Sequence, residues 1–290
     1  NGSLVLKLYY TRNSYEVKYQ YTGTVPSDAS ELPEAKYYKY GATVEVAEAA
    51  TATGYTFNGW SKTGTFTMPA EPVTITGSFT ANEYKLTIKN VFTDGTSAPP
   101  ATSRDVAFGS DVTARALSVS ATKGYTVRVA VEPQEAGLTV ADDQRSVTGT
   151  MPASDVTITF TYTPITVTLG DGAQIVKVDG EGQALNGAAF TFDGAPLTAN
   201  GNIFSLEGKT VTYGKTYTIT ETAPVGYTGV ESFQVKLDSD GESLKLVNSN
   251  TNVSINGFGI TVTNRINQYN LKVEHVYTGG PKNGEDVISA

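Results

Sequence analysis

The sequence predicts an all-β chain built from small modules in tandem. Apolar residues stand singly between polar ones over much of its length, as in Val73-Thr-Ile75-Thr, which is typical of strands with one buried and one wet face. Thr, Val, Tyr and Gly are abundant, and long helical stripes are nearly absent. With 290 residues, the chain is long for one sandwich and suits about two to four small domains.

The composition limits which partners the chain could bind and which covalent cross-links it could form. Its formal net charge of −8 argues against nucleic acid as a partner and suits a soluble, self-repelling chain. No apolar run is long enough to span a bilayer, and neither a signal peptide nor a wall-sorting tail is found, so no membrane insertion is expected. The chain has no cysteine, so a covalent staple would need other side chains.

Recurring phrases mark the starts and ends of modules. Asn-x-Tyr-x-[Val/Leu] occurs at 13–17, 82–86 and 267–271, and each time it opens an alternating strand. Met-Pro-Ala, followed by another alternating strand, closes the first two modules at 68–70 and 151–153.

Gly-Tyr-Thr supplies a third matched point, at 54–56 and 124–126. We therefore interpret residues 13–81 and 82–164 as two copies of one fold. The second copy is enlarged by an insertion between its Gly-Tyr-Thr and Met-Pro-Ala segments.

The remaining segments follow from these boundaries. Residues 165–266 lack both phrases and are predicted to form a module of another kind. Residues 267–290 restart the repeat and are too short to complete it. Residues 1–12, with a strand expected over Ser3–Tyr10, are interpreted as the end of a preceding repeat, so that the chain is a piece of something longer.

The run GYTFNGW at 54–60, followed by TFTMPAEPVTITGSF, is the most distinctive part of the first repeat. It resembles the internalin B-repeat and mucin-binding-like repeats found in tandem on Gram-positive surface proteins, which implies a β-grasp-like fold. The second repeat keeps the ending but has Val127–Val129 where 57–60 would fall. Some members of these families are linked to glycan binding, so a host glycan or an extracellular protein is the partner to consider.

Aromatic residues of the first repeat are the candidates for such binding. Trp60 could stack on a sugar, but its apolar neighbourhood favours a core position beneath the sheet. Tyr37, Tyr38 and Tyr40 form the other candidate patch. Alternation along a strand sends Tyr38 and Tyr40 to one face and Tyr37 to the other, so the three cannot form a single platform.

The third module contains the residues that could carry chemistry. On the strand 217–221, alternation puts Glu221 on the apolar face, and on the last strand, 260–264, it puts Asn264 on the apolar face. Both side chains are therefore predicted to point inward. The first strand of this module is apolar on both faces, so the pattern does not orient Lys177.

The order of these segments resembles the Cna B-type, or SpaA-like, domain over roughly 170–266. The phrase YTITETAPVGY at 217–227 is the most specific part, with an ETAPVGY spacing one residue shorter than the commoner form. The resemblance implies an Ig-like β-sandwich in which a first-strand Lys, a Glu in this phrase and a last-strand Asn form an intramolecular isopeptide bond. These positions correspond to Lys177, Glu221 and Asn264.

Burial would explain how these three side chains could react. Desolvation disfavours the charged forms of an amine and a carboxyl, which would leave a neutral nucleophile beside a protonated acid. Lys177 could then attack the Asn264 carboxamide, while Glu221 moves protons as ammonia leaves. The alternative is a plain buried ion pair of Lys177 and Glu221, with Asn264 capping a turn.

Two further signals carry less weight. Asp238–Glu242 has the composition of a calcium loop, but it lacks the later bidentate Glu, and its Asp-Gly pair favours a hairpin turn. His275 has no partner His or Cys for a metal site or a catalytic triad. We therefore expect no metal and no cofactor.

The resemblances imply a monomeric structural spacer of an extracellular, cell-wall-associated protein, in which the sole chemistry is one self-processing turnover, so that the chain is not an enzyme. Two alternatives stay open. One is a module that binds a glycan or a host protein, and the other is the accessory tail of an extracellular enzyme.

Overall fold

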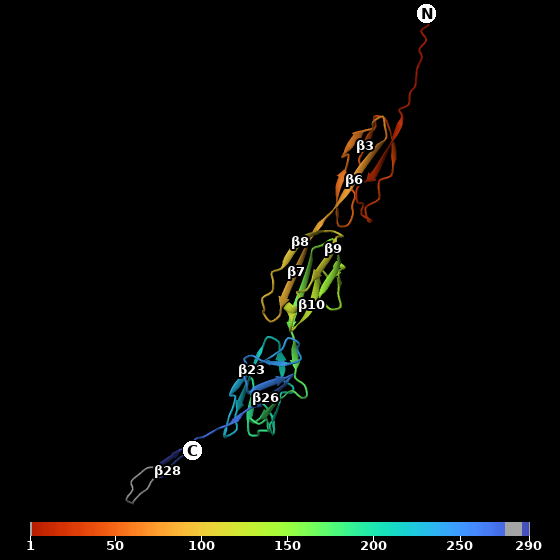
Figure 1. Ribbon diagram of the computed structural model, residues 1–290. Helices are drawn as coiled ribbons and strands as arrows, with labels where there is room; N and C mark the ends of the chain where they lie inside the picture. Colours follow the sequence, from red (N-terminus) through yellow and green to blue (C-terminus); the bar gives the residue numbers. More distant parts are fainter. Residues whose placement is uncertain (1, 276–285, 290) are drawn as a thin grey trace, which may run out of the picture. The chain divides into compact units, whose positions relative to one another are not determined.

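The computed structural model describes residues 2–275 and 286–289, and it is built almost entirely from β-strands (Figure 1). The all-β prediction is confirmed. Over the described ranges there are two short 3-10 helices, Ser120–Thr122 and Gln134–Ala136, and no α-helix. None of these residues forms a helix that could cross a bilayer.

The chain divides into two compact units. The first consists of Asn1–Leu117 and Val127–Thr161, and the second consists of Ser118–Thr126 and Tyr162–Ala290. The five segments expected from the sequence are finer than this division, and their boundaries stay predictions.

The first repeat is a four-stranded sheet with a small two-stranded sheet beside it. The large sheet has the order β2-β1-β6-β4, and the small sheet pairs β3 with β5. Its first and last strands, β1 and β6, are parallel neighbours, with Val17 opposite Val73. The strands are β1 (Ser14–Tyr21), β2 (Lys36–Lys39), β3 (Thr43–Glu45), β4 (Tyr55–Trp60), β5 (Thr65–Thr67) and β6 (Val73–Ala81).

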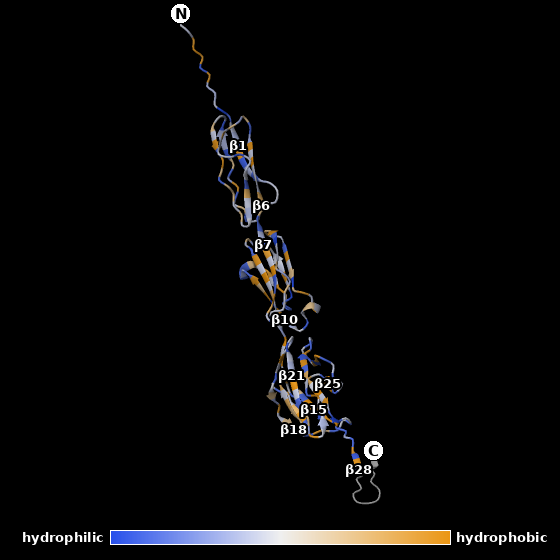
Figure 2. Ribbon diagram, turned by 90° about the vertical axis from the view of Figure 1, so that its left-hand side faces the viewer, coloured by the Kyte–Doolittle hydropathy of each residue, from blue (hydrophilic) through white to orange (hydrophobic). Residues whose placement is uncertain are grey.

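One hydrophobic core joins these two sheets. Hydrophobic and hydrophilic residues alternate along the strands (Figure 2), and the alternation buries Val73 and Ile75 of β6 as predicted. Val44 of β3 and Met68 contribute to the same cluster, at 1% and 0% exposure. The small sheet therefore packs against the large one through side chains on its inner face.

The second repeat has the same strand order. Its large sheet runs β10-β13-β7-β8, which corresponds strand for strand to β4-β6-β1-β2, and β9 pairs with β12 as β3 pairs with β5. The strands are β7 (Glu83–Phe92), β8 (Thr102–Ala107), β9 (Asp111–Arg115), β10 (Tyr125–Glu132), β11 (Thr139–Val140), β12 (Ser146–Thr150) and β13 (Val156–Pro164). The additional strand β11 and the 3-10 helix before it lie where the sequence predicts an insertion.

The Met-Pro segments of the two repeats occupy the same structural position. The backbone N–H of Met68 donates to the carbonyl of Ala42 at 2.8 Å, and that of Met151 donates to Ser110 at 2.8 Å. Both methionines are buried. The matched phrases in the sequence thus correspond to matched hydrogen bonds and matched core positions.

The third module is a sandwich of two five-stranded sheets. One has the order β18-β19-β15-β26-β25 and the other the order β17-β16-β21-β23-β24. Side chains from both sheets form a single buried cluster, which includes Ile175 and Val262 from the first and Ile219 and Val235 from the second. The strands are β15 (Gln174–Val178), β16 (Ala189–Phe192), β17 (Ala195–Pro196), β18 (Ala199–Asn200), β19 (Ile203–Ser205), β21 (Thr216–Thr222), β23 (Ser232–Leu237), β24 (Leu244–Leu246), β25 (Val253–Asn256) and β26 (Gly259–Thr263).

Two short strand pairs complete this module. β14 (Thr166–Thr168) pairs with β20 (Thr210–Thr212), and β22 (Tyr227–Thr228) pairs with β27 (Arg265–Ile266).

The strand predicted over Ser3–Tyr10 is wrong for this chain. These residues form no strand, and Leu4 and Tyr10 are 96% and 85% exposed. An alternating segment becomes a strand only when a neighbouring strand accepts its hydrogen bonds, and no described residue pairs with this one.

The last segment is only partly described. β28 (Lys272–His275) pairs with β29 (Asp286–Ser289), so that His275 lies at a strand end. The repeat predicted to restart over 267–290 includes 276–285 and 290, which lie outside the described residues.

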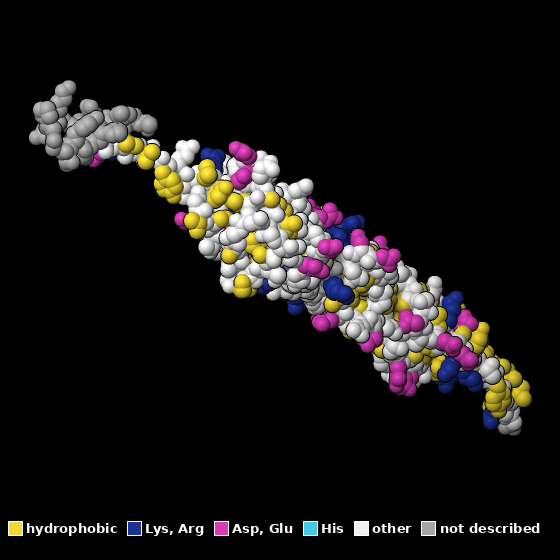
Figure 3. Space-filling view, turned by 90° about the horizontal axis from the view of Figure 1, so that it is seen from below, with side chains coloured by type: hydrophobic (Ala, Val, Ile, Leu, Met, Phe, Trp, Pro, Cys, Tyr) yellow, Lys and Arg dark blue, Asp and Glu magenta, His cyan; other side chains and the backbone are white. Residues whose placement is uncertain are grey.

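The surface mixes charges of both signs. Acidic and basic side chains are interspersed on the face in Figure 3. With a net charge of −8, such a surface repels polyanions and favours solubility.

Candidate functional site

Lys177 lies in the interior of the sandwich. Along β15 the buried residues are Ile175 and Lys177, whereas Val176 and Val178 are half-buried on the other side. Lys177 is 0% exposed. The structure thus resolves the orientation that the sequence pattern left open.

Asn264 comes to the same face from the neighbouring strand. β15 and β26 run parallel, with Lys177 opposite Val262. Asn264 follows Val262 by two residues, so its side chain points the same way as the Lys177 side chain. It is 0% exposed, as the alternation predicts.

Glu221 reaches the site from the opposite sheet. Along β21, Tyr217, Ile219 and Glu221 are buried and alternate with more exposed threonines, as predicted. The carboxyl group therefore crosses the core toward the strand pair that carries Lys177 and Asn264. The sandwich brings together three polar side chains, one from β15, one from β21 and one from the residue that joins β26 to β27.

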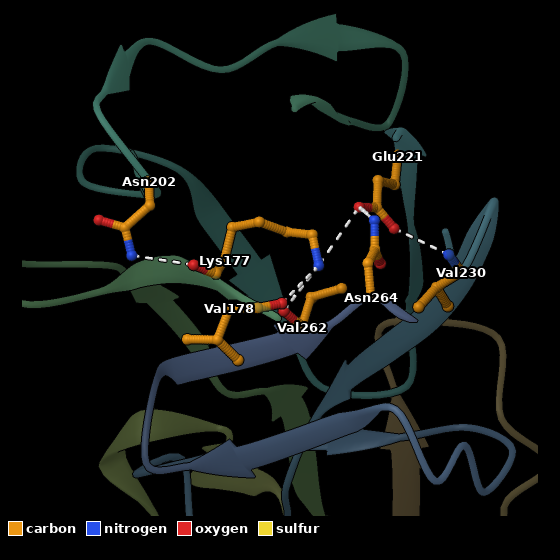
Figure 4. Close-up of polar contacts among 7 residues, drawn as sticks. All are labelled: Lys177, Val178, Asn202, Glu221, Val230, Val262 and Asn264. Atoms are coloured by element: carbon orange, nitrogen blue, oxygen red, sulfur yellow. Dashed lines mark hydrogen bonds and ion pairs between the residues drawn. The ribbon is translucent and has the colours of Figure 1, made fainter. Parts of the chain in front are cut away.

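A single oxygen atom joins the three groups. Glu221 Oε1 lies 3.6 Å from Lys177 Nζ, and it accepts a hydrogen bond from Asn264 Nδ2 at 2.7 Å (Figure 4). The side chains of Lys177 and Glu221 are both 0% exposed. The amine and the carboxamide nitrogen are thus held on the same atom without competing water.

Backbone groups fix the amine and the carboxyl. Lys177 Nζ donates to the carbonyl oxygens of Val262 at 2.9 Å and Val178 at 3.2 Å, and Glu221 Oε2 accepts from the N–H of Val230 at 2.8 Å. Asn264 Oδ1 is buried and has no hydrogen-bond partner among the described residues. A buried carbonyl oxygen without a donor is costly, which makes this atom the weak point of the arrangement.

Burial also changes the acid–base behaviour of the amine. Desolvation holds the pKa of Lys177 below its ordinary value of 10.5, and the nearby Glu221 carboxylate opposes that shift. The net direction favours the neutral amine. A neutral amine is a nucleophile, whereas an ammonium ion is not.

The arrangement can support either of the two readings that the sequence left open. The 3.6 Å contact between Lys177 and Glu221 is the ion pair that the simpler alternative requires. That alternative also has Asn264 capping a turn, but the Asn264 side chain hydrogen bonds Glu221 instead. The amine and the carboxamide nitrogen thus both contact the Glu221 carboxyl, as the reaction between them would also require.

The sequence did not indicate two groups that shape this site. One is the N–H of Val230, which holds Glu221 Oε2. The other is Gly229, where an added Cβ would lie 2.8 Å from the Ala223 Cβ and 3.0 Å from Glu221 Oε2. In the sequence, the glycine itself is the one feature that could have indicated either group, because a pattern of side chains does not record backbone N–H donors.

The aromatic candidates of the first repeat do not form a surface platform. Trp60 is 8% exposed, its indole N–H donates to the Glu48 carbonyl at 2.8 Å, and its ring stacks on Tyr21 at 5.6 Å. Tyr38 packs against the core cluster, whereas Tyr40 is 52% exposed in the turn after β2. Trp60 therefore occupies the core position that its neighbourhood favours.

The acidic segment Asp238–Glu242 is a hairpin turn between β23 and β24, as predicted. Asp238 N–H donates to the Ser243 carbonyl at 2.8 Å, and Gly241 has a positive φ of 78°. Asp238 also pairs with Lys245 at 2.6 Å. The described part of the chain has no group of three or more side chains that could hold a metal ion.

The all-β modules defined by these sheets have a family match in the first repeat. Residues 16–83 match the divergent InlB B-repeat domain. The internalin B-repeat prediction is thus confirmed for this segment, while the mucin-binding-like and Cna B-type resemblances stay interpretations. No curated protein matches the chain.

Several solved structures of bacterial proteins are similar to the chain. The pilus adhesin SpaC from Lactobacillus rhamnosus GG in its open conformation is 14% identical, with 89% of this chain and 44% of that chain covered and a TM-score of 0.26. The Bacillus anthracis TIE protein is 14% identical, with 90% and 55% covered and a TM-score of 0.35. Streptococcal SHIRT domains 3–4 are 18% identical, with 52% and 99% covered and a TM-score of 0.24.

The chain spans less than half the length of the two longer SpaC structures that it matches. The function proposed below therefore rests on the residues of this chain and on the B-repeat match.

Proposed function

We propose that the chain is a structural spacer region of a cell-wall-associated protein on a Gram-positive cell, and that an amide bond between Lys177 and Asn264 locks its sandwich. The B-repeat match over 16–83 supports the first part, because the resemblance to internalin B-repeats implies a tandem module of a surface protein. The second part is carried by one observation. Lys177 Nζ and Asn264 Nδ2 both contact Glu221 Oε1 in a site without solvent exposure.

The reaction begins with a proton transfer inside the buried pair. The proton of the Lys177 ammonium moves to the Glu221 carboxylate, which removes two charges from a dry interior. The protonated carboxyl then needs an acceptor. A half-turn of the Asn264 carboxamide would bring its unpartnered Oδ1 to that carboxyl, so that the acid polarises the carbonyl that the amine attacks.

The bonds and protons balance without any further reactant. Lys177 Nζ forms a bond to Asn264 Cγ, the Cγ–Nδ2 bond breaks, and one amine proton passes through Glu221 to the departing nitrogen. The products are a secondary amide and one ammonia. The fold holds the reactants together, which supplies the high effective concentration that such a slow reaction needs. Glu221 turns over once, so the chain processes itself and is not an enzyme in this proposal.

Intact mass spectrometry of the purified full chain tests the cross-link. The expected mass is lower than the calculated mass by one ammonia, and Glu221→Ala restores the full mass. Glu207→Ala, which alters an exposed glutamate of the same module, should keep the deficit. A full calculated mass for the unaltered protein overturns the cross-link, whatever the fold of the variants.

A further inference from the structure

The tripeptide Gly-Tyr-Thr occurs three times, at 54–56, 124–126 and 226–228. The first two copies belong to the repeats and the third to the sandwich, whose strand order is different. All three glycines have a positive φ, of 73°, 82° and 85°. The same turn thus serves two kinds of fold.

Each of these turns holds the chain where it leaves the module. The glycine carbonyl accepts the N–H of Asn82 at 2.9 Å in the first copy, of Ile165 at 2.8 Å in the second and of Asn267 at 2.8 Å in the third. All three accepted residues lie at or just after the end of a module's last strands. We call each of them the junction residue.

The threonine of the turn adds a second hydrogen bond. Thr56 Oγ1 donates to Asn82 Oδ1 at 2.6 Å, and Thr228 Oγ1 donates to Asn267 Oδ1 at 2.6 Å. Both asparagines also open the repeated phrase Asn-x-Tyr. The turn therefore recognises the first residue of a repeat by its backbone and its side chain.

An aromatic ring covers the glycine in the first two copies. A Cβ on Gly54 would lie 2.3 Å from the Phe108 ring, and a Cβ on Gly124 would lie 2.5 Å from the Tyr213 ring. Both glycines are buried. Only a glycine can lie so close to a ring and keep this backbone conformation.

The tyrosine of the turn meets the same ring edge to face. Tyr55 and Phe108 have ring centroids 5.5 Å apart at an interplanar angle of 81°, and Tyr125 and Tyr213 are 5.4 Å apart at 78°. The first contact lies within the first compact unit and the second within the second unit. Edge-to-face pairs of this kind stabilise a contact beyond the area that they bury.

The covering aromatic is itself part of a repeated element. Phe108-Gly109 and Tyr213-Gly214 are aromatic–glycine turns with a positive φ at the glycine, and the aromatic N–H donates to the junction carbonyl, of Asn82 or Ile165, at 2.8 Å. The junction residue thus binds the turn before it through its N–H and the aromatic after it through its carbonyl.

Tyr40-Gly41 is the third aromatic–glycine turn of this kind. Gly41 has a φ of 74°, and Tyr40 N–H donates to the carbonyl of Asn13 at 2.9 Å. Its ring, however, is 52% exposed, and its backbone carbonyl accepts from Arg12. Tyr40 therefore has the backbone contacts of Phe108 and Tyr213 without a glycine beneath its ring.

We propose that the Gly-Tyr-Thr turn of one β-module and the aromatic–glycine turn of the next form one recurring joint between successive modules. We call the Gly-Tyr-Thr turn the socket, because its glycine and tyrosine receive the ring, and the aromatic–glycine turn the plug. Phe108 and Tyr213 are seated plugs. Gly226–Thr228 is an open socket for the aromatic–glycine turn of a β-module joined through Asn267. Tyr40 is an open plug for a Gly-Tyr-Thr turn that precedes Asn13, so its role is module coupling and not glycan stacking.

The open socket has space for a ring. An added Cβ on Gly226 would meet no atom of the described residues within 4 Å, in contrast to Gly54 and Gly124. Tyr227 lines an open pocket of about 660 Å³ together with Arg265 and Ile266. Asn267 already makes its backbone and side-chain hydrogen bonds to this turn, and among the described residues no aromatic ring covers Gly226.

The joint can be tested in the full chain, because the absence of cysteine allows two labels to be introduced freely. Thr65→Cys and Thr113→Cys are exposed strand positions in the first and second repeats, and spin labels there report a distance distribution across the first joint. Gly54→Ala is expected to roughly double the width of that distribution, because the added methyl group overlaps the Phe108 ring.

Two matched controls separate the joint from general strain. Gly23→Ala imposes the same φ of 73° with no atom within 4 Å, so the width should not change. Phe108→Ala should broaden the distribution and Tyr40→Ala should not. Trp60 fluorescence reports whether Gly54→Ala unfolds the first repeat. If it does, the comparison of Phe108→Ala with Tyr40→Ala decides the test. Equal widths for Phe108→Ala and Tyr40→Ala overturn the proposal.

Discussion

In both the first repeat and the sandwich, an early strand lies parallel to a late one in the same large sheet: β1 beside β6 and β15 beside β26. In the repeat, the pair that faces the core at the start of this register is apolar, with Val17 opposite Val73 and both buried. In the sandwich, the same kind of strand pair carries a buried lysine, and Asn264 directly follows the end of the neighbouring strand β26.

This difference shows which interactions of each fold would resist mechanical unfolding. Tension on the two ends of the repeat loads β1 and β6, and tension on the two ends of the sandwich reaches β15 and β26 through the short strands β14 and β27 that flank them. The repeat opposes that load with hydrogen bonds and an aromatic core of Trp60, Tyr19, Tyr21 and Phe57. The sandwich has the groups for a covalent bond across the loaded strands, which a chain without cysteine cannot obtain from a disulfide.

The largest expected effect is the loss of the cross-link in Asn264→Leu. This variant removes the carboxamide and leaves the pair of Lys177 and Glu221. By analogy with a disulfide of similar span, we expect the sandwich to lose about 4 to 5 kcal/mol in its free energy of unfolding. Hydrogen exchange of peptides from β15 and β26, followed at increasing guanidinium concentration, measures this loss of unfolding free energy.

The first repeat serves as the internal control for that experiment. Trp60 is the sole tryptophan of the chain, so its fluorescence follows the repeat alone. Its unfolding midpoint should be the same in Asn264→Leu and in the unaltered protein. A shared shift of both transitions, or no shift in the sandwich, contradicts the comparison.

A smaller effect is expected from Gly229→Ala. The added Cβ would press on Glu221 Oε2 and on Ala223, which moves the carboxyl away from the amine and the carboxamide. Misplacement on this scale is expected to slow bond formation by about 10- to 100-fold. Intact mass followed over time after cell-free synthesis gives the rate.

Gly180→Ala is the matched control for this variant. Gly180 lies in a turn of the same module and would meet no atom within 4 Å. Both substitutions avoid a positive φ, so strain does not separate them. If Gly229→Ala forms the bond as fast as Gly180→Ala, the carboxyl does not depend on the space at Gly229.

The smallest effect is the pH dependence of the uncross-linked sandwich. Burial lowers the pKa of Lys177 in the folded state, so between that pKa and 10.5 the unfolded chain binds more protons than the folded one. The stability of Asn264→Leu should therefore rise as the pH rises through this window. Denaturant unfolding at several pH values measures the slope.

The control for the slope is Asn264→Leu combined with Lys177→Met, which has no amine to titrate. The additional rise should be absent from this double variant. In the unaltered protein an amide nitrogen would replace the amine, and the rise should be absent there too. A stability of Asn264→Leu that falls over this window, relative to the double variant, contradicts the argument from burial.

Strand alternation was enough to predict most of the candidate site. A carboxyl and a carboxamide at apolar positions, Glu221 and Asn264, had to point inward, and both do. Lys177 could not be oriented this way, because Val176 and Val178 give its strand a second apolar face. Which face of this strand is buried depends on where the second sheet packs, and that is a property of the tertiary structure.

Other features depend on backbone groups or on neighbours that a linear pattern does not record. The N–H of Val230 and the space at Gly229 belong to a loop whose path is set by β21 and β23. Alternation along a strand predicts Tyr38 and Tyr40 on one face, but β2 ends at Lys39, so the rule does not extend to Tyr40. The strand expected over Ser3–Tyr10 failed for lack of a partner.

The parallel pairing of β1 with β6 also has a consequence for the evolution of repeat number in such chains. A fold whose first and last strands run the same way receives the polypeptide at one end and releases it at the other. Duplication or deletion of the coding segment for one whole fold then alters reach in fixed increments and leaves the interior of every remaining fold intact. Recombination between similar segments could thus adjust length without any new packing solution.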